Sequence, residues 1–563
     1  EALSEVSSTV KNSSESNSLA MITNKQSGTI AEMTTIFANS LNSKLAIAEA
    51  IDQTVLSQSI QNVFGQQSIP NFDLANSDFI LSFGADFLGT WLSPVKYSRD
   101  YGQFRQGNDH RGKFIQIEPR MSLTGANADK WVYNIPGTEG KIALSIAYII
   151  MTEHTSEVDS AIVSQLTGGQ GASQLSQFAP ENISNETGID PKVIREIADN
   201  IISHKHSIII GGGSAGAHSN GIDNLDAIYS LNVLINNIGK KGGVIFNPKS
   251  IGGEQLSASS LENWQNLIAD MNSSKIDTAI IRGVNPIHAL PTALGFEKAL
   301  INVKNLYCIS NFMDDTTAMA NIILPESVYL ESWGDDVPNP LPGYDVVTFQ
   351  QPVVKTLNDS KSYGDIILEI SKSIGGDVAN QLPWQNTKEA IRDKASKLYN
   401  TGKGTIKSAS FEEFWNGLLQ RGVWLDQENK GESVISTVKN LPSGMSSPRY
   451  NASTGAKYYL LPFETNTLGD GIGANLPWLQ NITDLLTTVA WETWVEINPQ
   501  IADKEGIVEG DEIKITSPYG NIVALAYIHP AASPDVISVP IGQGHKHFGR
   551  FRVGPNIEKF RTF

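Results

Sequence analysis

Five short, mainly apolar runs are the feature that most constrains how this chain can fold. Four of them end at a glycine or a proline, and stretches with helical periodicity lie between them. Such runs are typical of parallel strands that helices cover on both faces. The alternation therefore predicts doubly wound, mainly parallel α/β sheets, which bind ligands at the carboxyl ends of their strands. The five runs are residues 19–22, 78–84, 113–119, 206–211 and 278–283.

The pattern changes beyond Trp491. Short runs rich in β-branched residues, at 512–516, 522–526 and 536–539, are separated by glycine, proline and aspartate. This spacing is typical of a small β-barrel. The stretch at 386–455 is rich in Lys, Asn, Ser and Gly and has weak periodicity, so we expect a connector there with one helix near 411–419.

The charge balance argues against a partner that is recognised through negative charge. The chain has 42 Lys and Arg against 59 Asp and Glu, which gives a formal charge of −17. An acidic surface repels nucleic acid and anionic lipid. The longest apolar run, at about 142–151, is too short to cross a bilayer.

A single cysteine limits the redox chemistry that the chain can support. Cys308 lies in an apolar stretch that predicts a buried strand, so we interpret it as a structural thiol. One cysteine excludes an intrachain disulfide. It also excludes an iron–sulfur cluster that cysteines of this chain alone would hold.

Two features at predicted strand ends are candidates for anion binding. The run from Gly211 to Gly216 could cradle a phosphate with backbone N–H groups, but it lacks both the dinucleotide-binding spacing and a P-loop lysine. A tight turn is the favoured interpretation. Arg120 ends another strand, where it could bind an anion or form a salt bridge with a neighbouring acid. The sequence leaves these two roles of Arg120 open.

The remaining polar clusters favour structural roles. His545 and His547 have a spacing that a metal site could use, but no second ligand cluster accompanies them, so we expect a surface or interface loop. The pairs Asp314-Asp315 and Asp335-Asp336 are interpreted as turn or capping residues. No arrangement of Ser, His and Asp predicts a nucleophile.

Seven short segments, spread over nearly the whole chain, match the motifs of one known family. Glu118-Pro119-Arg120 resembles a D-P-R motif, and residues 282–286 resemble a G-x-N-P motif. The other segments are 75–86, 126–129, 231–243, 320–326 and 495–511. Each match is short, but together their order and spacing resemble the molybdopterin oxidoreductase (DMSO reductase-like) superfamily.

The resemblance implies how the chain divides into domains. Residues 1–47 and 248–385 would form one discontinuous α/β domain, and residues 48–247 a second. The connector at 386–455 would lead to a C-terminal β-barrel of the double-psi type at 456–563.

Four further segments narrow the resemblance to one branch of this superfamily. Residues 84–95, 329–335, 475–480 and 542–545 are similar to the molybdopterin-like subunit of alternative complex III. They are also similar to its relative in the quinone reductase complex of sulfate reducers. In those complexes this subunit lacks a molybdenum cofactor and lies beside iron–sulfur, multihaem cytochrome c and integral quinol-binding subunits.

The branch implies a non-catalytic scaffold in a membrane-bound, quinol-oxidising electron-transfer complex. The chain would hold no cofactor and would be peripheral to the cytoplasmic membrane on its periplasmic side. Iron–sulfur clusters and haem c are expected in partner subunits or in segments beyond this chain. The vestige of a pterin-dinucleotide site would consist of Gly84, Asp86, Arg120, Gly211, Gly212 and Gly213.

The alternative is an active molybdenum or tungsten oxidoreductase that binds molybdopterin guanine dinucleotide. Active relatives place Cys, selenocysteine, Ser or Asp on the metal shortly before the strand at 78–84. Counting back reaches Ala50, which cannot ligate a metal, although Asp52 is close enough to serve after a small shift. Under this alternative, Asp52 is the metal ligand and a partner holds the clusters. A third interpretation is a binding protein that retains a nucleotide without metal.

Overall fold

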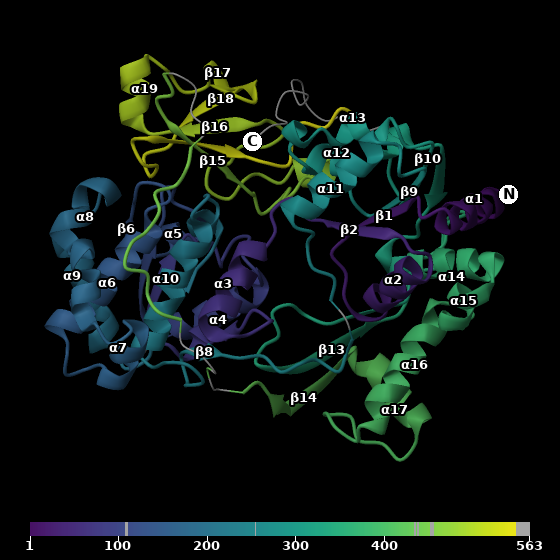
Figure 1. The fold of residues 1–563 in the computed structure, drawn as a ribbon, viewed down its shortest axis with the longest axis horizontal. Coiled ribbons are helices and arrows are strands. Elements are labelled where there is room, and N and C mark those ends of the chain that lie inside the picture. The colour runs from purple at the N-terminus through teal and green to yellow at the C-terminus, as the bar shows by residue number, and fades with distance from the viewer. Residues whose placement is uncertain (107–110, 254, 433–434, 436–438, 451–454, 548–563) are drawn as a thin grey trace.

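The computed structural model describes residues 1–106, 111–253, 255–432, 435, 439–450 and 455–547 (Figure 1). Its first α/β unit is built on a parallel sheet in the order β11-β10-β9-β1-β2. The parallel pairing confirms the predicted parallel sheet. Two separate stretches of chain supply its strands. The strands are β1 Leu19–Asn24, β2 Lys44–Ala48, β9 Thr278–Arg282, β10 Asn305–Ser310 and β11 Ile322–Pro325.

Helices cover both faces of this sheet, because alternate side chains of each strand point to opposite sides. Leu19 and Met21 of β1 belong to the core under α1, α2 and α14, whereas Ala20 and Ile22 belong to the core under α11 and α13. These helices are α1 Ala2–Glu15, α2 Gly28–Ser40, α11 Leu261–Asn272, α13 Phe296–Leu300 and α14 Tyr363–Ile374. Cys308 is buried in β10, which confirms the predicted buried thiol.

The second α/β unit contains a parallel sheet in the order β6-β5-β4-β7. Its strands are β4 Phe79–Phe83, β5 Lys113–Ile117, β6 Lys130–Val132 and β7 Ser207–Gly211. Its main helices are α3 Thr54–Phe64, α4 Pro94–Arg105, α6 Glu139–Glu153, α9 Pro191–Ser203 and α10 Gly221–Leu234. The apolar run at 142–151 lies within α6, where it packs into the core of this unit. Among the residues that the structure describes, no helix has the length and apolar character needed to cross a membrane.

A small antiparallel sheet, β12-β13-β14, lies beside the first unit. Its strands are β12 Gly334–Asp336, β13 Tyr344–Gln350 and β14 Val423–Lys430. It packs with α16 Thr387–Asn400 and α17 Phe411–Arg421. The sequence predicted one helix in 386–455, which corresponds to α17. The structure adds α16 and β14, so the first half of this stretch is packed structure instead of a simple connector.

The C-terminal part is a curled five-stranded sheet in the order β15-β19-β16-β18-β17. It lies against the carboxyl ends of the α/β strands, at the top of Figure 1. Its strands are β15 Tyr459–Phe463, β16 Trp494–Ile497, β17 Glu512–Ser517, β18 Gly520–Ile528 and β19 Val536–Pro540. Parallel and antiparallel pairs are mixed in it, which agrees with the predicted C-terminal β domain.

Candidate functional site

The candidate site lies where the strand order of the second sheet reverses. From β4 the chain continues to β5 and β6 on one side, and β7 is added on the other side. Crevices at such reversals are the usual ligand sites of open α/β sheets. Here the loops after β4 and β7 meet β15 of the C-terminal sheet around a cavity of about 260 Å³. Its lining includes Ile51, Gln53, Trp91, Glu118, Ser122, Ser214, His218 and residues 460–464.

Most of the residues singled out in the sequence come together at this cavity. Gly84, Asp86, Arg120 and Gly213 line it. Gly211 and Gly212 lie directly before Gly213, at the end of β7, and are not among the lining residues. Asp52 does not line the cavity either. It is exposed, and its carboxylate accepts a hydrogen bond of 2.7 Å from the backbone N–H of Thr54 at the start of α3.

The glycines at the two strand ends allow the chain to pack against itself. A Cβ atom on Gly84, where φ is +64°, would lie 2.4 Å from Ser214 Oγ. A Cβ atom on Gly212 would lie 2.2 Å from Trp91 Nε1. The indole of Trp91 therefore packs directly against Gly212, where only a residue without a side chain fits.

Trp91 is held in this position by other rings. It is almost fully buried and stacks on Phe72 and Tyr97, with ring centroids 5.6 Å and 5.8 Å away. Its Nε1–H makes no hydrogen bond with any described residue.

Arg120 forms a salt bridge that decides between the two roles left open by the sequence. Its Nε donates to Glu496 Oε2 at 2.5 Å and its Nη2 donates to Glu496 Oε1 at 2.8 Å. The guanidinium carbon also lies 3.6 Å from the centroid of the Phe463 ring. Glu496 belongs to β16 and has no exposed surface. The cation is thus neutralised and stacked by the C-terminal sheet.

Carboxyl groups give the cavity its remaining charge. Asp86 Oδ1 accepts hydrogen bonds from the N–H and the Oγ1–H of Thr124, so this side chain ties the loop after β4 to α5 Leu123–Ala126. Burial raises the pKa of Glu118 to about 7, although Ser122 and Gln116 donate hydrogen bonds to it. Burial, together with Asp470 and Glu49, also raises the pKa of Glu464 to about 7.

Several residues of the site were not predicted from the sequence. Glu118 belongs to the recognised Glu118-Pro119-Arg120 segment, so its position carried a usable signal. Trp91 lies within the segment 84–95, but nothing there indicated that it covers Gly212. Glu464 has no local signature, and Glu496 lies in the matched segment 495–511, where nothing indicated that it pairs with Arg120; only the docking of the C-terminal sheet brings both residues to the site.

The corresponding edge of the first sheet has little open space at the carboxyl ends of β9 and β10. A cavity of about 80 Å³ remains beside Gly283 and Asn285. Asp315 accepts hydrogen bonds from the backbone N–H groups of Lys546 and His547, at 2.7 Å and 3.1 Å. His545 is buried, with Nδ1 lying 3.2 Å from Asp315 Oδ2, and its ring stacks on His288 at 3.6 Å.

The polar clusters outside the cavity have structural roles. His545 is buried at the interface between the C-terminal part and the first unit, while His547 is exposed. Asp314 caps the turn at Thr317, and Asp335 caps α2 by accepting hydrogen bonds from Thr29, as the sequence suggested for both pairs. Over the described part of the chain, no three His, Cys, Asp or Glu residues are grouped so that they could hold a metal ion.

Comparison with known proteins reveals the relatives of this fold. The molybdopterin oxidoreductase family model matches residues 1–373, and the molydopterin dinucleotide binding domain model matches residues 480–557. The chain is 23% identical to the menaquinone reductase molybdopterin-binding-like subunit of Nitratidesulfovibrio vulgaris, over 95% of this chain and 74% of that protein. It is 24% identical to the molybdopterin-containing subunit of arsenate respiratory reductase from a Shewanella species, over 86% and 71%.

A solved structure has the same fold. Acetylene hydratase from Pelobacter acetylenicus superposes with a TM-score of 0.73 over 96% of this chain and 82% of that protein, at 16% sequence identity.

Proposed function

This chain belongs to the molybdopterin oxidoreductase family, and from that premise we propose that it is a non-catalytic subunit of a membrane-bound, quinol-oxidising electron-transfer complex. In this role it resembles the corresponding subunit of alternative complex III. It positions iron–sulfur and multihaem cytochrome c subunits next to integral quinol-binding subunits. The complex membership is supported by the similarity to a menaquinone reductase subunit.

One observation carries the non-catalytic part of the proposal: the chain itself uses the groups that a dinucleotide would need. The N–H of Gly212 donates to the carbonyl of Phe83 at 3.0 Å and Trp91 packs against this glycine, while Glu496 and Phe463 contact the guanidinium of Arg120. Phosphate groups bind to free backbone N–H groups and free cations. The cavity instead offers the carboxyl groups of Asp86, Glu118 and Glu464. These residues do not fit a molybdopterin dinucleotide.

The size of the two crevices agrees with this assignment. Sites for organic ligands usually span about 300–1,000 Å³. The cavity beside β4 and β7 measures about 260 Å³ and the one beside β9 about 80 Å³. A pair of dinucleotides would have to displace Trp91 at one crevice and the segment at 542–547 at the other.

The proposal places the chain at the periplasmic side of the cytoplasmic membrane, held there by its partners. Cofactors belong to those partners in this scheme, because electrons move between closely spaced centres and this chain supplies no ligand set within its described residues. The active alternative required Asp52 as a metal ligand. Nothing in the geometry favours it, since Asp52 is exposed and caps the N–H of Thr54.

Metal and pterin analysis of the native complex tests the proposal. The complex is purified from membranes, molybdenum, tungsten and iron are measured by inductively coupled plasma mass spectrometry, and the fluorescence of oxidised pterin is recorded. We expect iron and haem with no stoichiometric molybdenum, tungsten or pterin. One molybdenum or tungsten per chain, together with pterin, would overturn the non-catalytic assignment. Purification of this chain without any iron- or haem-containing partner would overturn the scaffold role.

A further inference from the structure

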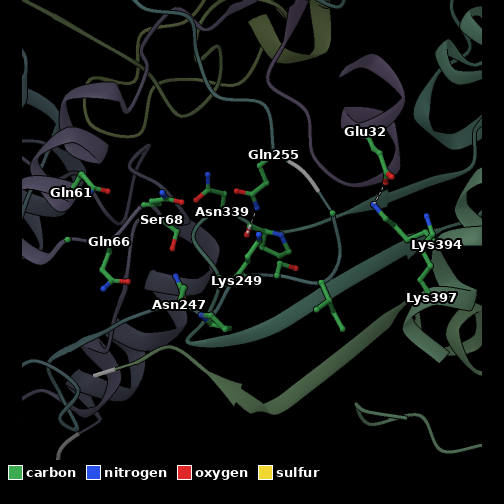
Figure 2. A pocket seen from close by; sticks show the side chains of 18 residues that line it. Glu32, Gln61, Gln66, Ser68, Asn247, Lys249, Gln255, Asn339, Lys394 and Lys397 are labelled. Carbon is green, nitrogen blue, oxygen red and sulfur yellow. Dashed lines mark hydrogen bonds and ion pairs between the residues drawn. The ribbon is translucent and has the colours of Figure 1, made fainter. Parts of the chain in front are cut away.

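A second, larger cavity lies away from the glycine run, between the two α/β units (Figure 2). Its volume is about 820 Å³, and five separate stretches of chain line it. These are Glu32 of α2, the end of α3 with the following loop at 61–68, residues 247–251 with Gly253 and Gln255, the loop at 338–341, and Lys394 and Lys397 of α16. The function proposed above does not use this cavity.

Uncommitted amide groups form one wall. Gln61, Gln66, Gln67 and Asn339 line the cavity, and their side chains make no hydrogen bond with another described residue. Asn247 differs, because it donates to the carbonyl of Ile69 at 2.8 Å and accepts from Gly343 N–H, so it holds the wall together. A free amide group offers both a donor and an acceptor. This wall is therefore suited to hydroxyl groups, which also donate and accept.

Three lysines bring positive charge to the cavity: Figure 2 shows Lys394 and Lys397 on one side, near Glu32, and Lys249 beside Asn339. Lys249 is exposed and has no ion pair with a described residue, and Lys397 pairs only with Asp393 on its own helix at 3.3 Å. Exposed pairs of this kind hold the ammonium group weakly, so it can turn to a ligand. Among the described residues that line the cavity there are three lysines and one carboxylate, Glu32, in a chain whose net charge is −17.

Lys394 joins α16 to α2 at the edge of the cavity. Its side chain is 6% exposed, and Nζ lies 3.1 Å from Glu32 Oε2. It also faces Asp335, whose pKa is raised to about 6 by burial, while Lys394 opposes that rise. A buried ammonium is costly unless carboxylates compensate it. Lys394 therefore has a structural role in the wall of the cavity. Lys249 and Lys397 are the lysines that can contact a ligand.

We propose that this cavity binds a small polyol that carries an oxyanion, the chemical class of sugar phosphates and sugar acids. The amide wall receives the hydroxyl groups, and Lys249 and Lys397 receive the phosphate or carboxylate. None of the described residues that line the cavity is aromatic. A nucleobase would lack a surface on which to stack, which excludes a nucleotide as the favoured ligand.

Isothermal titration calorimetry of the full chain at low ionic strength tests the proposal. The probes are glucose 6-phosphate, glucuronate, glucose and inorganic phosphate. At least one of the two charged sugars is expected to bind at least about tenfold more tightly than glucose or inorganic phosphate, which corresponds to one charge-assisted contact. The two charged probes distinguish a phosphate ester from a carboxylate. No binding of either charged sugar up to about 10 mM would overturn the proposal.

Substitutions locate the binding. Lys249→Gln and Lys397→Gln are each expected to lower the affinity for the charged sugar about tenfold. Gln66→Ala is expected to lower this affinity less. Lys355→Gln, at an exposed lysine outside the cavity, is the matched control and should bind as the unchanged protein does. All four positions are at least partly exposed, so the variants are expected to fold. Unchanged affinity in both lysine variants, or binding of neither charged sugar more tightly than glucose and inorganic phosphate, would overturn the proposal.

Discussion

Arg120 and Glu496 lie 376 residues apart in the sequence and form a two-point ion pair between the second α/β unit and the C-terminal sheet. The backbone reinforces this contact on both sides. Met121 N–H donates to the carbonyl of Ala531 at 3.0 Å, and Ser533 N–H donates to that of Pro119 at 2.9 Å. The end of β5 is thereby fixed to the C-terminal sheet, directly over the candidate site.

Breaking this pair is expected to destabilise the protein strongly. Glu496→Gln leaves a buried guanidinium without its counter-charge, and such a loss costs about 3–5 kcal/mol. Glu181→Gln is the control, because Glu181 pairs with Arg195 at the surface, where a pair contributes about 0–1 kcal/mol. Urea denaturation of both variants checks the difference. Equal midpoints for the two variants would contradict the role assigned to Arg120.

The close contact between Gly212 and Trp91 predicts that a single methyl group is not tolerated. Gly212→Ala would place Cβ against the indole nitrogen, and overpacking of this kind costs about 1–3 kcal/mol. The φ of Gly212 is 174°, so the cost is steric and not a backbone penalty. Gly102→Ala is the control: Gly102 lies in α4 with nothing within 4 Å of an added Cβ. That change should stabilise by up to about 1 kcal/mol.

Thermal denaturation of the two alanine variants measures this contrast. Adding Trp91→Phe to Gly212→Ala should recover part of the loss, because the smaller ring vacates the contact. Loss of stability by the same amount in both alanine variants, or no recovery in the double variant, would show that Trp91 does not pack against Gly212.

Several strands of both α/β sheets could be predicted from the sequence for a physical reason, whereas β2, β6 and β11 were not among the predicted runs. Four of the predicted strands, β4, β5, β7 and β9, are buried on both faces. Their residues therefore form continuous apolar runs, and each run is followed by a glycine or a proline. Helix α16 was missed because it buries only a narrow stripe, including Ala390, Ile391, Ala395 and Leu398, among many charged residues. The spacing of that stripe is helical, so the signal was present but weak.

The candidate site could be predicted only in part. Gly84, Asp86, Arg120 and Gly213 follow strands of one sheet, and carboxyl ends of parallel strands meet at one edge. The pairing of Arg120 with Glu496 could not be predicted, because Glu496 lies in another sheet and the motif at 495–511 does not indicate which residue it contacts. The role of Trp91 depends on its stacking against Phe72 and Tyr97, which no local pattern encodes.

The raised pKa of Glu464 predicts that the stability of the folded protein depends on pH. Its pKa is 4.5 in the unfolded chain and about 7 in the folded protein. A raised carboxyl pKa means that the folded state favours the protonated form. The stability it contributes is therefore complete below about pH 4.5 and is lost as the pH rises through about 7.

Glu464→Gln mimics the protonated side chain. It should raise the midpoint of thermal denaturation at pH 8, by an amount equivalent to about 1–3 kcal/mol, and should change it little at pH 5. Thermal scans of both proteins across this pH range check the prediction. A stabilisation of equal size at both pH values would indicate a packing effect unrelated to ionisation.

The burial of Cys308 predicts that its thiol reacts only when the chain unfolds. The side chain is buried in β10 among residues of the first unit, and burial raises the pKa of its thiol well above the ordinary value. The thiolate is the reactive form, so both its scarcity and its lack of access slow the reaction. Ellman's reagent should label almost no thiol at pH 8 in the native protein and one thiol per chain in denaturant, since the chain has one cysteine. The labelling rate in intermediate denaturant should follow the loss of tertiary structure, measured by tryptophan fluorescence. Rapid labelling of the native protein would place Cys308 at an accessible surface and contradict the sheet packing described for β10.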